Sequence, residues 1–389
     1  MKFQVSYYDN NHRAKLLKHK YFHKIERLIN QGLDVDDDEF IIYSIFREQK
    51  NYPGWRTYQE LKDHLPYRID TFRKYFDTSS GTLRARFPSK DFDLVQTESS
   101  GVAASLLIMN RIYDLHEADW QRIPITKKKS LDFELASNGT EYIQVEAKGT
   151  VFDDGQHLKA SSQKSSIEAK KEAQRKTSPS NTSFFGVITG IPHHHTVSSQ
   201  CLLLDPPADV IAEDPKKYQL LARLYFYTEY LRTISRSNLV MALMNRIQDL
   251  QLSERYLDFD GIPLLNTYGE RLEVPPASVY NKSFISDRIA GNIFPINRTE
   301  FFYSAIDLEV YPLIVNQSFY DIRTYKSELA ELSSNLREIR ARINIEDLKR
   351  FEIPIEGFER IPLTNEVLVD LKGKIHVNPS GRVIGFFSK

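Results

Sequence analysis

The chain has 389 residues, of which 41% are hydrophobic and 27% are charged, and its 52 Lys and Arg residues balance 52 Asp and Glu residues. These proportions are typical of a globular protein, and the length favours two or three domains. The single cysteine excludes an internal disulfide framework and a cysteine zinc site. No apolar run approaches the roughly 18–20 residues of a membrane span, and residues 1–10 hold no apolar signal segment. We therefore expect a cytoplasmic protein without a membrane segment.

Residues 1–95 predict a helical N-terminal region. Two short helical patterns, 57–64 and 69–76, are joined by Leu65-Pro66-Tyr67-Arg68, and residues 81–87 follow as a candidate wing. A pair of helices of this size fits a DNA-binding helix-turn-helix. Two short amphipathic helices are more often simply packed together, so both interpretations stay open on the sequence alone.

Residues 96–215 mix helices and strands, which indicates the α/β class. The predicted elements, in chain order, are a helix over 98–115, strands over 122–126, 131–136 and 141–148, a polar helix over 158–175, and strands over 184–191 and 200–204. The strands over 131–136 and 141–148 flank the turn signal Asn138-Gly139 and predict a hairpin.

The hairpin carries the candidate catalytic residues. Side chains two positions apart in a strand share a face, so Glu146 and Lys148 point to the same side, opposite an apolar face. With a two-residue loop, Asp132 would lie among the apolar side chains at a cost of several kcal/mol. A loop with an odd number of residues, with Gly139 left-handed, brings Asp132 to the face of Glu146 and Lys148. We therefore expect an odd loop.

Two carboxylates that converge in this way repel each other unless a cation lies between them. Such oxygen ligands suit Mg²⁺ or Mn²⁺, which keep several waters and bind phosphate oxygens. An ammonium beside them, here Lys148, can orient or deprotonate an attacking water or neutralise charge at phosphorus. The alternative is that Asp132, Glu146 and Lys148 form a solvated hairpin face with ordinary cross-strand ion pairs.

The spacing Asp132-x13-Glu146-x-Lys148 resembles the motif of the PD-(D/E)XK nuclease superfamily, although Leu131 stands where the family name has proline. The resemblance covers under a third of the chain. It implies a restriction-endonuclease-like core, a central mixed sheet flanked by helices, in the order helix, three strands, helix, strand. Glu98-Ser-Ser-Gly101 resembles an E-x-x-G found in the first helix of many members, which implies that Glu98 is a further catalytic metal ligand. Alternatively, Glu98 is a helix-start acid behind an N-cap at Thr97.

The resemblance implies a Mg²⁺-dependent DNA endonuclease that hydrolyses phosphodiester bonds and leaves a 5′-phosphate, with Mn²⁺ as a substitute. By analogy, the role would be restriction or phage defence. The candidate nucleic-acid contacts are Gln144, Gln163, Lys164, Lys127, Lys128 and Lys129. Two alternatives remain: a catalytically silent nucleic-acid-binding or assembly protein on the same fold, and an unrelated α+β protein in which the hairpin is only surface.

Residues 216–389 predict a helical and α+β C-terminal region for dimerisation or for DNA or partner recognition. Apolar residues from Ile322 to Ile343 recur at spacings of three and four, which predicts one long helix with a narrow apolar stripe. That helix would pair with its twin in a homodimer or pack on a helix of its own chain. An activating protein partner is a further hypothesis.

Overall fold

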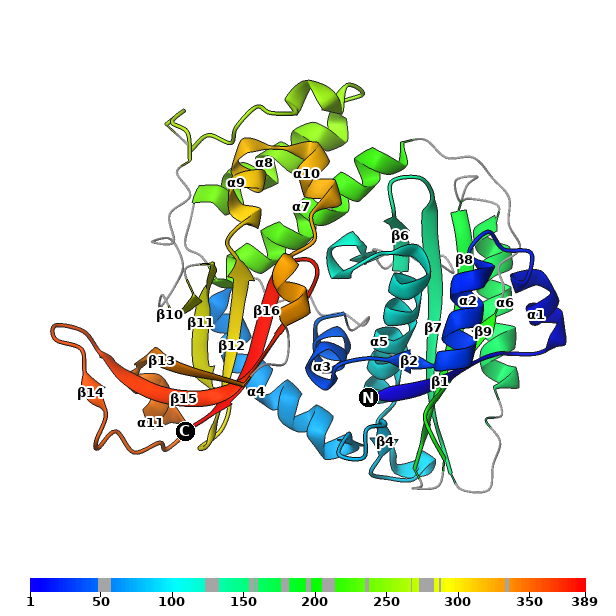
Figure 1. Cartoon of the computed structure of the whole chain (residues 1–389), viewed down its shortest axis with the longest axis horizontal. Helices are drawn as coiled ribbons and strands as arrows, with labels where there is room; N and C mark the ends of the chain where they lie inside the picture. Colours follow the sequence, from blue (N-terminus) through cyan, green and yellow to red (C-terminus); the bar gives the residue numbers. More distant parts are fainter. Residues whose placement is uncertain are drawn as a thin grey trace. The chain divides into compact units, whose positions relative to one another are not determined.

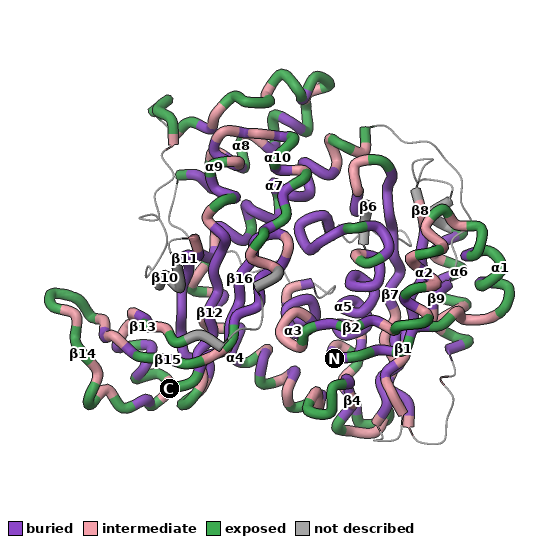
Figure 2. The backbone as a smooth tube through the Cα atoms, viewed as in Figure 1, coloured by how far each residue is buried: buried purple, intermediate pink, exposed green. Residues whose placement is uncertain are grey.

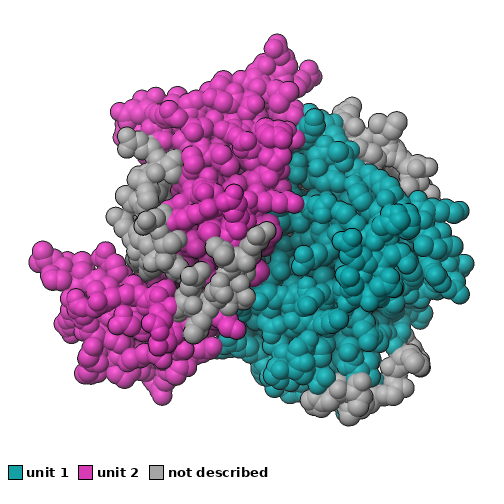
Figure 3. All heavy atoms as spheres, in the orientation of Figure 1, with its two compact units in different colours: residues 1–52, 68–222 teal, residues 53–67, 223–389 magenta. Residues whose placement is uncertain are grey.

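A computed structural model describes residues 1–47, 57–122, 133–153, 158, 160–175, 182–193, 197–204, 214–234, 238–266, 268–272, 283–286, 288–332 and 336–389. They divide into two compact units, unit 1 (Met1–Tyr52 and Arg68–Ala222) and unit 2 (Pro53–Tyr67 and Arg223–Lys389) (Figure 3). Two of the three boundaries between the units fall inside helices, α4 (Tyr58–Tyr75) and α7 (Pro215–Ile234). Among the described residues, no helix combines the length and the apolar character that a bilayer crossing requires.

Unit 1 is built on a mixed sheet, which within the described residues has seven strands in the order β2-β1-β9-β8-β7-β6-β5 (Figure 1). The strands are β1 (Lys2–Tyr7), β2 (Leu33–Asp34), β5 (Gln121–Arg122), β6 (Phe133–Ser137), β7 (Tyr142–Phe152), β8 (Thr182–Pro192) and β9 (Gln200–Leu204). Strands β5, β6 and β7 pair antiparallel, whereas β8 runs parallel to β7. Helix α5 (Leu94–Tyr113) precedes β5, and helix α6 (Ser161–Arg175) connects β7 to β8. The chain is thus of the mixed α/β class, and the predicted order of helices and strands over residues 98–191 is confirmed.

Helix α5 covers one face of this sheet. The helix begins after Asp93, whose side chain accepts a hydrogen bond from the Val95 backbone N–H, so the predicted N-cap at Thr97 is wrong. Two glycines allow the helix to approach β7 closely, because a Cβ at Gly101 would lie 2.5 Å from the Gly149 nitrogen and one at Gly149 would collide with the Thr97 carbonyl. Both α5 and the central strands are buried along most of their length (Figure 2).

Helix α6 covers the opposite face. Its buried residue Ile167 packs over β8, where a Cβ at Gly186 would lie 2.6 Å from the Ile167 Cγ2 atom. Ile188 and Leu204 complete this small apolar cluster. The polar helix that the sequence predicted is therefore held to the sheet by a single narrow apolar stripe.

Unit 1 also contains the N-terminal helices and a short hairpin. These elements are α1 (Asn10–Leu16), α2 (Phe22–Gln31), α3 (Asp37–Phe46), β3 (Phe76–Asp77), β4 (Arg84–Ala85) and the 3-10 helices η1 (Ser89–Asp91) and η2 (Glu117–Asp119). The predicted helix-turn-helix is wrong, because Tyr58–Tyr75 form one continuous helix, α4, with Pro66 inside it. Leu61, Leu65, Ile69 and Phe72 are all buried and form one stripe that continues through the proline.

Unit 2 holds a second sheet, antiparallel, with the strand order β10-β11-β12-β16-β15-β13 and β14 beside β15 among its described residues. The strands are β10 (Ser283–Ser286), β11 (Ile289–Pro295), β12 (Glu300–Asp307), β13 (Leu336–Asn344), β14 (Glu359–Arg360), β15 (Glu366–Val377) and β16 (Arg382–Ser388). The helices are α8 (Asn238–Leu252), α9 (Val310–Asn316), α10 (Phe319–Thr324), α11 (Ile345–Arg350) and the 3-10 helices η3 (Tyr256–Phe259) and η6 (Glu328–Leu332). One apolar core joins both ends of the sheet, with Ile289 and Ile293 of β11 packed with Ala341 and Ile343 of β13.

The predicted long helix over 322–343 is wrong. This stretch contains the end of α10, then η6, then strand β13, so it offers no helical homodimer interface. The reason is a second pattern in the same residues: Ala341 and Ile343 are buried, while Arg340 is exposed and Arg342 is half-buried. This alternation has the period of a strand, and β13 pairs with β15 along nine residue pairs.

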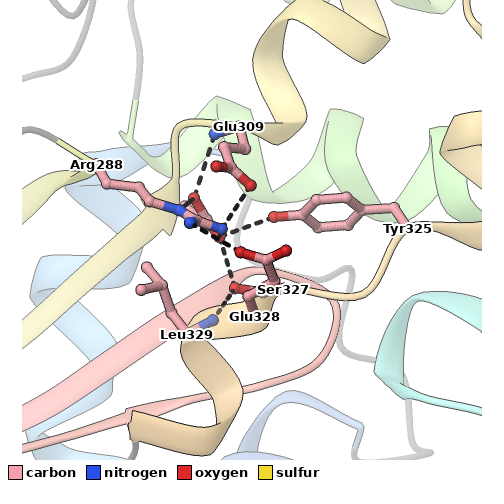
Figure 4. A network of polar contacts seen from close by, with 7 residues as sticks. Arg288, Glu309, Tyr325, Ser327, Glu328 and Leu329 are labelled. Atoms are coloured by element: carbon pink, nitrogen blue, oxygen red, sulfur yellow. Dashed lines mark hydrogen bonds and ion pairs between the residues drawn. The ribbon is translucent and has the colours of Figure 1, made fainter.

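A buried carboxylate organises one end of the second sheet (Figure 4). Asp307, fully buried at the end of β12, accepts hydrogen bonds from Arg288, Tyr325 and Ser327. Arg288 also pairs with Glu309 and Glu328. This cluster ties the start of β11 to the segment that follows α10, and its polar groups are satisfied by one another.

Candidate functional site on strand β7

The centre of the candidate site is Glu146, in the middle of β7. Its side chain is 0% exposed, and its Oε1 atom forms ion pairs with the ammonium groups of two lysines, accepting a hydrogen bond from Lys170. Lys148 Nζ lies 2.8 Å away and Lys170 Nζ 2.6 Å away, and these side chains are 27% and 23% exposed. A carboxylate buried this completely is not part of a solvated hairpin face, so that alternative is wrong for Glu146.

Lys170 comes from helix α6 and reaches Glu146 because of the packing one turn earlier. Glu146 lies directly beside Gly186 in the β7–β8 ladder. Ile167 packs over that glycine, and Lys170 follows three residues later on the same side of the helix. The absence of a side chain at Gly186 therefore brings α6 close enough for Lys170 to contact the carboxylate.

The hairpin reaches the predicted register by a different route. Its loop runs from Asn138 to Glu141, an even number of residues, so the predicted odd loop is wrong. Asn138 Oδ1 accepts hydrogen bonds from the Thr140 and Glu141 backbone N–H groups, and Gly139 is left-handed with φ 86°, as predicted. A register shift between Ala136 and Phe133 then compensates, and Phe133 pairs with Val145. The pairing of Phe133 with Val145 is the register that puts position 132 on the face of Glu146, as predicted for Asp132. Asp132 itself lies outside the described residues.

Gln144 lies two residues before Glu146 on the same face of β7. Its side chain is 3% exposed, and no described residue donates a hydrogen bond to its buried Oε1 atom. Leaving a buried acceptor unpaired costs about 1–3 kcal/mol. The acceptor is therefore suited to a donor from outside the described residues, such as a water molecule.

The other predicted residues are placed differently. Glu98 is partly buried in the second turn of α5, the helix on the opposite face of the sheet from the Glu146 side chain. Lys164 pairs with Asp9 at 3.1 Å and lies 4.8 Å from the centre of the Tyr8 ring, while Gln163 accepts a hydrogen bond from Ser162. Lys127, Lys128 and Lys129, like Asp132, fall outside the described residues.

The described part of the site supplies only part of the ligand set that a divalent cation needs. Glu146 supplies one carboxylate, and Mg²⁺ is commonly held by one or two carboxylates together with waters and phosphate oxygens. Within the described ranges, no group of three His, Cys, Asp or Glu side chains is placed to hold a metal ion. A second carboxylate would have to come from Asp132, as the sequence predicts.

Lys170 is not among the site residues predicted from the sequence. It lies in a Glu168-Ala-Lys170 triplet that has the same spacing as Glu146-Ala-Lys148, but on a helix, where positions two apart diverge. The available signal was the polar character of α6 with Ile167 as its one apolar anchor. Placing Lys170 opposite Glu146 required the helix-to-strand packing as well.

Comparisons of the chain with protein-family models, with curated proteins and with solved structures find no significant match. The functional interpretation therefore stands on the geometry of the chain itself.

Proposed function

We propose that the protein is a Mg²⁺-dependent DNA endonuclease with its active site on β7. The observation that carries the proposal is the fully buried carboxylate of Glu146, with Lys148 on the same face of the strand. The strand lies inside a sheet built in the order helix, three strands, helix, strand. That order is the one that the resemblance to PD-(D/E)XK nucleases implies, and it supports the restriction-endonuclease-like assignment.

In this proposal Asp132 and Glu146 hold the divalent cation. Glu98, predicted as a third carboxylate ligand, belongs to the helix on the opposite face of the sheet and is left out of the proposed ligand set. The cation, when bound, supplies a Lewis acid for the scissile phosphate and acidifies a bound water. Lys148 orients or deprotonates the attacking water, or neutralises negative charge that develops on phosphorus. The unpaired Oε1 of Gln144 accepts a hydrogen bond from a water in the site. A role in restriction or phage defence follows by analogy only.

The test is cleavage of plasmid DNA by the full chain with added Mg²⁺ or Mn²⁺. Glu146→Gln keeps the shape of the side chain but removes a ligand charge, and Lys148→Ala removes the cation beside the water. Each change should reduce cleavage by about 10²-fold or more. A higher metal concentration should partly rescue Glu146→Gln, whose defect is affinity, but not Lys148→Ala, whose defect is in the chemical step.

The matched control is Glu168→Gln, which alters the same kind of triplet on α6 and should leave cleavage intact. DNA binding, measured by gel shift, should survive both active-site changes because phosphate contacts elsewhere dominate affinity. Undiminished cleavage by Lys148→Ala would place the chemistry elsewhere. DNA binding by the unmodified chain without any cleavage would favour the catalytically silent nucleic-acid-binding alternative.

A further inference from the structure

Two ammonium groups share one oxygen atom at the candidate site. Lys148 and Lys170 both form ion pairs with Oε1 of Glu146, so two positive charges face one negative charge. The two lysine side chains are partly exposed while the Glu146 side chain is fully buried. Within this trio, the cationic side is therefore the one that solvent and ligands can reach.

Helix α6 is anchored on both sides of Lys170. Ile167 packs over Gly186 one turn before it, and the next residue, Lys171, is buried and donates a hydrogen bond to the Leu204 carbonyl at 3.4 Å. The backbone at Lys170 is thus held in place. Its ammonium stands on a four-carbon stem that can leave Glu146 by rotation of the side chain alone.

A divalent cation and the Lys170 ammonium compete for the same carboxylate. Mg²⁺ requires oxygen ligands at about 2.0–2.1 Å. A lysine nitrogen 2.6 Å from Oε1 lies in the region where such an ion would approach the carboxylate. Two cations this close would also repel each other strongly in a buried site.

We propose, on the basis of the nuclease function above, that Lys170 is the resident counter-ion of Glu146 in the metal-free protein. A divalent cation then binds Glu146 by displacing Lys170. The displaced ammonium stays in the site, where it can pair with a phosphate oxygen of the substrate. Lys170 is a positioning residue that sets the metal concentration at which the site becomes occupied.

The size of the effect follows from occupancy. The apparent dissociation constant equals the intrinsic constant divided by the fraction of molecules in which Glu146 is free to bind metal. If Lys170 occupies Glu146 in about 90% of molecules, removing its charge should tighten metal binding about tenfold.

The experiment is a calorimetric titration of the full chain with MnCl₂ in the absence of DNA. Lys170→Met keeps the apolar stem and should bind Mn²⁺ about tenfold more tightly than the unmodified protein. Lys170→Gln is a second variant with a polar end, and Lys170→Arg, which keeps the cation, should show no tightening. Lys18→Met removes an exposed lysine of the same unit and should change the affinity by less than about twofold, as expected for a screened surface charge.

A Glu146→Gln/Lys170→Met double variant identifies the site, because the tightening must disappear when the carboxylate is removed. Equal or weaker binding by Lys170→Met would overturn the counter-ion role. If the unmodified protein still shows binding that Glu146→Gln abolishes, only this inference fails and the proposed nuclease function stands. If neither the unmodified protein nor Lys170→Met binds Mn²⁺ through Glu146, both fail.

Discussion

Glu39, in the first turn of α3, is an acid whose environment disfavours its charge. Burial raises its pKa to about 7, and the carboxylates of Asp36 and Glu117 add to the increase while Arg111 opposes it. The side chain is partly buried beside the helix that covers the sheet of unit 1. Because the folded pKa exceeds the usual value of 4.5, the folded state holds this proton where the unfolded state releases it.

Stability of the chain should therefore fall as the pH rises from 4.5 to about 7, through the titration of Glu39. Glu39→Gln removes the buried charge and should raise the melting temperature at pH 8 by about 2–4 °C or more. This increase in melting temperature should vanish near pH 4. Asp38→Asn, in the same helical turn, should instead cost a small amount of stability at pH 8 by weakening the interaction with the helix dipole. Thermal melts at pH 4, 6 and 8 would check this, and an unchanged gain at all three would contradict it.

At the scale of elements, the contact between α5 and β7 sets the position of the candidate site. A methyl group at Gly149 would collide with the backbone carbonyl of Thr97, so Gly149→Ala must push the helix away from the strand. We expect a loss of about 3 kcal/mol or more in the free energy of unfolding by urea. A Cβ at Gly186 meets side chains rather than backbone, the Ile167 Cγ2 atom at 2.6 Å and the Leu204 Cβ atom at 3.2 Å, so Gly186→Ala should cost less, about 1 kcal/mol. Similar losses for the two variants would show that α5 tolerates displacement.

The elements around the candidate site could be predicted because several local signals agree there. The residues of β7 alternate between apolar and polar, the Asn138-Gly139 turn precedes the strand, and the α6 helix is polar around the apolar Ile167. The face shared by Glu146 and Lys148 follows from these signals alone. The contact of Lys170 does not, because it depends on the close approach over Gly186, a property of tertiary packing.

In two other segments the sequence pattern fits two different structures, and tertiary packing determines which of them forms. Leu336, Ile339 and Ile343 fit a helical spacing, but the alternation of Ala341 with its charged neighbours fits a strand, and pairing with β15 selects the strand. Pro66 indicated a break in α4, yet the buried stripe continues across it. The packing of that stripe offsets the hydrogen bond that the proline removes.

At the scale of the whole molecule, the two units are interleaved in the sequence. Unit 2 includes the first half of α4, where Tyr58 packs edge-on against Phe294 and Lys62 pairs with the nearly buried Asp347. A fragment of residues 223–389 lacks these contacts and leaves the Asp347 carboxylate unpaired, which typically costs 3–5 kcal/mol for a buried pair.

We therefore expect residues 223–389 alone to show no cooperative thermal transition by circular dichroism. A peptide of residues 57–75, added in excess, should restore one by binding the folded form. The same peptide with Lys62→Met should be a poorer partner. A cooperative melt of the fragment without any peptide would show that the first half of α4 is dispensable for unit 2.

The parallel pairing of β1 with β9, in which Gln4 lies opposite Gln200, constrains how the protein is made. The first strand leaves the ribosome early, but its partner follows almost 200 residues later, about 10–40 s at ordinary rates of synthesis. During that interval one edge of β1, whose buried face carries Phe3 and Val5, has no strand to pair with. The nascent chain therefore carries an aggregation-prone edge, and its production should depend on chaperones that shield such edges until residues 200–204 emerge.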